Sequence, residues 1–217
     1  MTDAPDIPIT PELVLRGYAA GVFPMADSAD DPRVYWVKPE MRGIIPLDGF
    51  HLSRSLRRRM LRGGYEVTVS RRFQEVVRAC ADRPQTWINQ TIFDLYSRLF
   101  SMGFAHSIEV IRDGNLIGGV YGISLGGAFF GESMFSRETD GSKIALANLV
   151  AVLDVGGFTL LDTQFQTRHL KSLGAIEIPQ AEYIALLDKA LTKPAKFLKS
   201  GIFLDQDAVV QRITHTS

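Results

Sequence analysis

Residues 118–136 read GGVYGISLGGAFFGESMFS, and residues 160–166 read LLDTQFQ. The first segment predicts two strands around a glycine turn, and the second predicts a further strand that ends in polar residues. Polar groups at the ends of such apolar strands indicate an apolar pocket with a polar mouth. The polar side chains concerned are Glu132, Ser133, Ser136, Asp162 and Gln164.

The composition is that of a globular protein, with 217 residues of which 46% are hydrophobic and 22% charged. This length suits one domain with a small appendage. The single cysteine, Cys80, excludes an internal disulfide framework and suits a reducing compartment. The acidic start MTDAPDIPIT does not resemble a signal peptide, and no apolar run is long enough to cross a membrane. We therefore expect a cytoplasmic protein that has no membrane partner. A monomer is also expected.

The zero net charge conceals a partition along the chain. Residues 51–85 hold nine basic and three acidic residues, whereas residues 1–50 hold four basic and eight acidic ones. A dense basic block repels itself unless an anion is near, so it favours a polyanionic partner. A solvated helix face is the alternative, and the sequence leaves it open. The arginines of this block are Arg54, Arg57, Arg58, Arg59 and Arg62.

The N-terminal part predicts a small unit of its own. Thr10 precedes Pro11 and Glu12 as a helix cap, and Gly21 ends that helix. The forty residues that include this helix are too few to bury a core alone. We therefore expect a cap domain at 1–40 that packs on a main domain at 41–217.

The main domain is expected to alternate strands with helices. Strands are predicted at 65–69, 106–112, 116–124, 128–132 and 158–161, with a further candidate at 201–204. Helices are predicted after the caps Ser53, Ser70 and Asn89, near Ser142, over 167–173, and finally from Pro179 to Leu191. This order predicts an α+β domain with a mixed, mostly antiparallel sheet flanked by helices. It resembles the acetyltransferase-like (GNAT) fold.

The two carboxylates beside the expected pocket are the strongest candidates for chemistry. Glu132 and Asp162 each end an apolar strand, where a carboxylate must find a partner or shift its pKa. Structural roles remain open for both, with Glu132 holding Arg137 or a helix N-terminus and Asp162 capping the turn before Thr167. The four histidines lie far apart, so no metal site is expected.

The sequence departs from a coenzyme A enzyme at one diagnostic turn. GNAT acetyltransferases seat the coenzyme pyrophosphate on a Q/R-x-x-G-x-G/A turn at a helix N-terminus. The corresponding turn here reads SRETDGSK, from 136 to 143. The fold is therefore expected without its usual cofactor, and no other cofactor is expected.

A series of motifs resembles leucyl/phenylalanyl-tRNA–protein transferases from about residue 10 onward. The motifs are GVFPMAD, LSRSLRR, TWI, AHSIEV, GGVYG, FGESMFSR, SKIAL, LLDTQ and SLGA-EIP, in this order. The resemblance implies that leucine or phenylalanine, and methionine less well, passes from aminoacyl-tRNA to the N-terminal Arg or Lys of acceptor proteins. Such a transfer marks the acceptor for N-end rule degradation. The five arginines would then contact tRNA phosphates.

The resemblance also implies a substrate site. Trp87 and Tyr96 would lie near the terminal adenosine, and the family often has tryptophan where Met25 stands. The residues expected at the amino-acid pocket are Val120, Phe129, Ser133, Met134, Leu149 and Leu153. Some of these positions hold methionine or phenylalanine in the family, so the smaller lining here leaves the balance between leucine and phenylalanine open.

The hypothesis for catalysis is alignment of an activated ester with a free amine. Gln164, held by Asp162, would orient the attacking amine, and Glu132 with Asp162 would attract the cationic acceptor residue. An amide is a poor base, which favours positioning over proton transfer. Two alternatives remain open: a coenzyme A-dependent N-acyltransferase, and a non-catalytic RNA-binding module.

Overall fold

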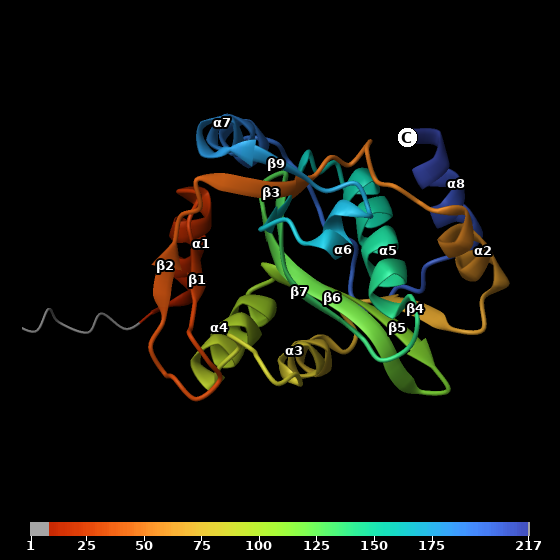
Figure 1. The fold of residues 1–217 in the computed structure, drawn as a ribbon, viewed down its shortest axis with the longest axis horizontal. Helices are drawn as coiled ribbons and strands as arrows, with labels where there is room; N and C mark the ends of the chain where they lie inside the picture. Colours follow the sequence, from red (N-terminus) through yellow and green to blue (C-terminus); the bar gives the residue numbers. More distant parts are fainter. Residues whose placement is uncertain (1–8, 217) are drawn as a thin grey trace, which may run out of the picture.

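A computed structural model describes residues 9–216, and within them the chain folds around one large mixed sheet (Figure 1). The strand order is β4-β5-β6-β7-β8-β3-β9, and every neighbouring pair is antiparallel except β7 with β8. This confirms the predicted mixed, mostly antiparallel sheet. The strands are β3 (Met41–Ile45), β4 (Glu66–Val69), β5 (Ala105–Arg112), β6 (Asn115–Leu125), β7 (Ala128–Ser136), β8 (Leu160–Gln164) and β9 (Ile176–Pro179).

Helices cover both faces of this sheet and bury a separate apolar core on each. One core joins the sheet to α2 (Arg54–Arg62), α5 (Gly141–Val155) and α8 (Gln206–Thr216). The other joins it to α1 (Pro11–Ala19), α3 (Phe73–Ala81), α4 (Gln90–Ser101) and α7 (Gln180–Leu191). The short α6 (Arg168–Lys171) follows β8. Within the described residues, no helix is long and apolar enough to cross a membrane.

The parallel pair β7–β8 opens part of the way along its length. Backbone pairing between the two strands ends at Phe130 and Asp162. Beyond that point β7 stays paired with β6 as far as Ser136. The predicted end of this strand at residue 132 was therefore wrong: the glycine-rich β6 carries it four residues further. Glu132 lies at the point where β7 and β8 separate, not at a strand terminus.

The N-terminal residues join the core of the main sheet. Thr10 caps α1 by accepting from the Leu13 amide at 3.2 Å, as predicted. A hairpin of β1 (Phe23–Met25) and β2 (Tyr35–Val37) follows. Val14 and Tyr18 are fully buried in the same core as α3 and α4. The first eight residues of the predicted 1–40 cap lie outside the described part.

The structure departs from the local predictions at four points. Ser70 does not cap α3: its φ is 50°, and the Arg71 and Arg72 amides donate instead to the Glu109 carboxylate at 3.3 and 3.4 Å. The segment before α7 forms β9, an edge strand paired with β3. A helix, α8, follows residue 205 where no element was expected, and the candidate strand at 201–204 makes only an isolated bridge at Phe203.

Candidate active site

A cavity of about 260 Å³ lies between the diverging ends of β7 and β8. It brings together six of the residues singled out from the sequence and adds six others. The predicted residues are Met25, Trp87, Glu132, Ser133, Met134 and Gln164. The additional residues are Phe23, Arg83, Thr163, Phe165, Thr167 and Leu170. The structure thus has a cavity at this point of the sheet, lined by both apolar and polar side chains.

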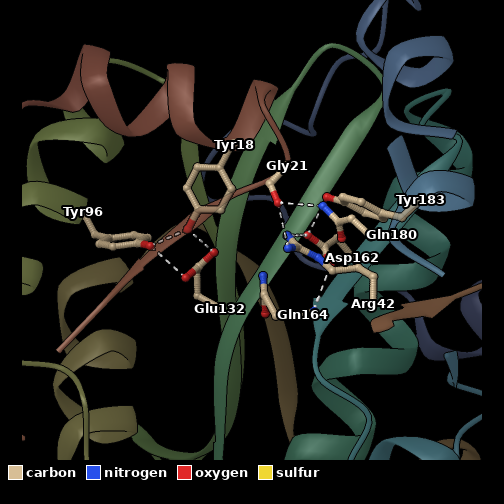
Figure 2. Close-up of polar contacts among 9 residues, drawn as sticks. All are labelled: Tyr18, Gly21, Arg42, Tyr96, Glu132, Asp162, Gln164, Gln180 and Tyr183. Carbon is tan, nitrogen blue, oxygen red and sulfur yellow. Dashed lines mark hydrogen bonds and ion pairs between the residues drawn. The ribbon is translucent and has the colours of Figure 1, made fainter. Parts of the chain in front are cut away.

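Two tyrosines hold the Glu132 carboxylate (Figure 2). The Tyr18 hydroxyl donates to Oε1 at 2.5 Å, the Tyr96 hydroxyl donates to Oε2 at 2.8 Å, and the two hydroxyls lie 2.6 Å apart. Burial raises the pKa of Glu132 to about 7, although both tyrosine hydrogen bonds act to lower it. Burial also raises the pKa of both tyrosines, so their hydroxyls remain donors. Glu132 is therefore poised to change charge near neutral pH.

Asp162 forms a buried ion pair with Arg42 across β8 and β3 (Figure 2). The guanidinium donates to Oδ1 at 2.9 Å and to Oδ2 at 2.6 Å, and both side chains are 0% exposed. The Tyr183 hydroxyl donates to Oδ2 at 2.9 Å. The Phe23 and Tyr183 rings lie 4.7 and 4.4 Å from the Arg42 guanidinium carbon. Because Asp162 is already neutralised, it offers no free charge to a cationic acceptor, which differs from the sequence-based hypothesis.

Gln164 ends β8 in a left-handed backbone conformation, with a φ of 57°. Its backbone amide donates to Asp162 Oδ1 at 2.8 Å, which holds this unfavourable conformation in place. Asp162 therefore holds Gln164 through the main chain and not through the side-chain amide. The Gln164 Nε2 atom is buried and has no hydrogen-bond partner among the described residues, while the residue lines the cavity. Figure 2 shows its side chain between the Glu132 group and the Asp162 group. An unpaired buried donor at a cavity wall is available to a bound ligand.

The remaining predicted substrate residues lie behind the cavity. Tyr96 is fully buried against Glu132 and cannot stack on a bound base. Four others, none of which lines this cavity in the described structure, belong to the core on the α5 side: Val120, Phe129, Leu149 and Leu153. Met134 lines the cavity, pairs with Val120 in the sheet, and packs against that core. The apolar end of the cavity therefore borders these residues through Met134.

The other polar candidates have local structural partners. The Glu132–Arg137 pair is not formed, since the two tyrosines hold Glu132. Asp162 does cap the turn after β8, because it accepts from the Gln164 amide besides pairing with Arg42. Ser136 Oγ accepts from the Ser142 amide at 3.1 Å at the start of α5. Burial raises the pKa of Cys80 to about 12, so this thiol is no nucleophile. No group of three or more His, Cys, Asp or Glu in the described part could hold a metal ion.

Three residues that hold the two site carboxylates were also missed in the sequence: Arg42, Tyr18 and Tyr183. Arg42 stands before the apolar run Gly43–Ile45, and a buried carboxylate such as Asp162 requires a cation. That requirement was the available signal. It did not say which of the 24 basic residues would supply the cation, because the partner lies 120 positions away. For Tyr18 and Tyr183 the sequence indicated only that a buried hydroxyl needs a hydrogen-bond partner, not which residue that partner is.

Comparisons with known proteins match nearly the whole chain. Residues 44–188 match the family model described as leucyl/phenylalanyl-tRNA protein transferase, and residues 8–40 match the model of its N-terminal domain. A leucyl/phenylalanyl-tRNA–protein transferase of Cereibacter sphaeroides (strain ATCC 17025 / ATH 2.4.3) is 59% identical over 96% of this chain and 98% of the relative. One of Ruegeria pomeroyi is 57% identical over 96% of this chain and 99% of the relative.

A solved structure shares the fold. The crystal structure of FemX aligns with a TM-score of 0.53 and 14% identity, over 75% of this chain and 65% of that one. The alignment speaks for the fold alone, because the identity is so low. Together with the strand order, it confirms the GNAT-like architecture expected from the sequence.

Proposed function

Because the chain belongs to the leucyl/phenylalanyl-tRNA–protein transferase family and is an aminoacyltransferase, we propose that the cavity between β7 and β8 receives the aminoacyl end of the tRNA. The observation that carries this proposal is that Glu132 lines the same cavity as Gln164, whose buried Nε2 has no hydrogen-bond partner among the described residues. Leucine or phenylalanine, and methionine less well, would lie against Met134 and Leu170. Trp87, with Met25 nearby, would contact the terminal adenosine.

The transfer needs alignment more than a strong base. The acceptor's α-amine has an ordinary pKa of about 7.7–8.0, so a useful fraction is neutral at pH 7. Its nitrogen attacks the ester carbonyl, the ester C–O bond breaks, and the tRNA 3′ oxygen leaves with a proton while the amine loses one. The Gln164 amide would accept from the attacking amine through Oε1 and donate to the developing oxyanion through Nε2. Asp162 and Arg42 would act by holding the Gln164 backbone.

The acceptor end of the site points to a cationic residue. Glu132 is the carboxylate that lines the cavity, whereas Asp162 is neutralised by Arg42. A lysine or arginine side chain at the acceptor's N-terminus would therefore pair with Glu132, and we propose such proteins, destined for N-end rule degradation, as substrates. Work on aminoacyl-tRNA suits the cytoplasm, and the site is built within one chain, in keeping with a monomer. The arginines of α2 would contact tRNA phosphates.

The two parts of the chain would then share the site. We propose that residues 1–40 form a cap and residues 41–217 the transfer domain, with Tyr18 reaching from the first part to Glu132 in the second. This division also matches the two family models, which meet between residues 40 and 44.

Incubation with charged tRNA and peptides tests the proposed reaction. Leucyl-tRNA and a peptide that starts with arginine should give a peptide longer by one leucine, as measured by mass spectrometry. A matched peptide that starts with glutamate should remain unmodified, because its side chain would be repelled by Glu132. Coenzyme A thioesters should not replace the tRNA. Equal transfer to both peptides would contradict the assignment of Glu132, and no transfer from tRNA would contradict the function.

The pH profile should separate Glu132 from the attacking amine. Acceptor use requires ionised Glu132, with its pKa of about 7, and a neutral amine. Below both pKa values, log kcat/KM for the arginine peptide should therefore rise with pH at a slope of about two. In Glu132→Gln the slope should fall to about one, because only the amine still titrates.

Glu177→Gln is the matched control, since Glu177 is an exposed carboxylate on β9. It should keep the slope of about two. Equal slopes in the wild type and in Glu132→Gln would show that Glu132 is not the titrating group.

A further inference from the structure

The segment after Gln164 places an exposed aromatic side chain at the rim of the cavity. Phe165 is 46% exposed although it is large and apolar, and it lines the cavity together with the half-buried Trp87. Its ring packs edge-on against Phe23, with ring centres 5.7 Å apart. Its backbone is also fixed, because a Cβ added to Gly43 would come within 2.7 Å of the Phe165 carbonyl carbon. Phe165 is thus a rigid, solvent-facing ring beside the site.

A run of exposed basic side chains follows directly on α6. Leu170 of this helix and its cap, Thr167, line the cavity, while Arg168 and Lys171 are exposed. Neither of these two cations has an ion pair or hydrogen-bonded side-chain partner within residues 9–216. The segment 165–175 contains no acidic residue. Asp140, whose charge acts on the neighbouring His169, is itself paired with Lys143 at 2.8 Å.

Backbone contacts join the same segment to the residues just before α2, the helix that carries the five arginines. The His51 amide donates to the Leu173 carbonyl at 3.0 Å. Gly174, with a φ of 97°, approaches so closely that an added Cβ would lie 2.2 Å from the Gly49 carbonyl oxygen. Segment 49–62 contains no acidic residue either. It includes Ser53, the cap of α2, and the five arginines of that helix. Two segments without acidic residues, 165–175 and 49–62, therefore lie side by side between the cavity rim and α2.

We infer that Phe165, Arg168 and Lys171 bind the unpaired 3′ arm of the donor tRNA between the cavity and α2, an inference that rests on the proposed function. Arg168 and Lys171 contact backbone phosphates, as unpaired cations beside an RNA path do. The half-buried Trp87 contacts the terminal adenosine inside the cavity. The more exposed Phe165 therefore stacks on the base that precedes this adenosine. The aromatic side chain and the two cations thus act on different parts of the tRNA.

Three donors of increasing length test this division: 3′-O-leucyl-adenosine, leucyl-cytidylyl-adenosine and leucyl-tRNA. Arg168→Ala/Lys171→Ala should raise the KM for leucyl-tRNA about tenfold and lower the slope of log KM against log salt by about 1.5, since about 0.7–0.9 is lost per phosphate contact. The same variant should leave kcat/KM for leucyl-adenosine within about twofold. Phe165→Leu should weaken use of the dinucleotide and of tRNA by about tenfold, but not use of leucyl-adenosine.

The matched control is the double variant Arg16→Ala/Lys189→Ala, which removes one exposed arginine on α1 and one exposed lysine on α7. This variant should match the wild type with all three donors and keep the salt slope. The inference fails if both α6 and Phe165 variants use leucyl-tRNA like the wild type, or if they raise the KM for the acceptor peptide instead. A wild-type enzyme inactive with leucyl-tRNA would instead overturn the proposed function itself.

Discussion

Gln164→Ala is expected to lower the rate of single-turnover transfer about 100- to 1,000-fold, the usual loss when one oxyanion donor is removed. The substitution takes away the one amide that faces the cavity without a hydrogen-bond partner, among the described residues that line it. The fold should persist, since Gln164 is held by its backbone amide and not by its side chain. Quenched-flow assays with leucyl-tRNA and an arginine peptide measure the rate, and thermal unfolding should shift by only a few degrees.

Gln166→Ala is the matched control for this experiment. The Gln166 amide donates to the Ala175 carbonyl at 2.6 Å and is not among the residues that line the cavity. Its loss should leave the rate within about threefold of the wild type. Asp162→Asn should also slow transfer, because it weakens the hold on the Gln164 backbone. If Gln164→Ala and Asp162→Asn each stayed within about twofold of wild type, the assignment of Gln164 would be wrong.

Arg42→Met is expected to lower the free energy of unfolding by about 3–5 kcal/mol, the cost of leaving a buried charge without its partner. Arg42 and Asp162 are both 0% exposed, so water cannot replace the lost guanidinium without a rearrangement of the core. The measurement is urea unfolding followed by circular dichroism. Transfer activity should fall as well, because Asp162 would no longer be fixed beside Gln164.

An exposed ion pair supplies the control for Arg42. Arg33 binds Asp31 at 2.7 Å, but its side chain is 84% exposed, so Arg33→Met should leave the free energy of unfolding nearly unchanged. Combining Arg42→Met with Asp162→Asn should restore part of the lost stability, since the stranded charge is then removed. Similar losses for Arg42→Met and Arg33→Met, or purely additive effects in the double variant, would contradict the buried-charge explanation.

Features set by a few neighbouring residues could be predicted from the sequence. Thr10 and Asn89 each accept from the amide three residues ahead, at 3.2 and 2.8 Å, as their cap positions indicated. Asp113 and Gly114 both have positive φ at the predicted hairpin. The two segments quoted for the site, 118–136 and 160–166, also lie side by side, because β7 and β8 pair in the sheet.

Features set by distant partners could not be predicted. Ser70 has the chemistry of a cap, but the carboxylate of Glu109, buried on the neighbouring strand, takes that role. The true end of β7 depends on how far β6 remains paired with it, which local hydrophobicity does not record. The tyrosines around Glu132 come from α1 and α4, so only the folded chain shows that they meet.

The distance in sequence between Arg42 and Asp162 affects when the site can form during synthesis of the chain. A ribosome adds about 5–20 residues each second, so the 120 positions between them take on the order of ten seconds to synthesise. During that interval the guanidinium has no carboxylate to meet, and Tyr18 has no Glu132 until residue 132 emerges. We therefore expect a nascent chain to be inert toward charged tRNA until most of it has been synthesised.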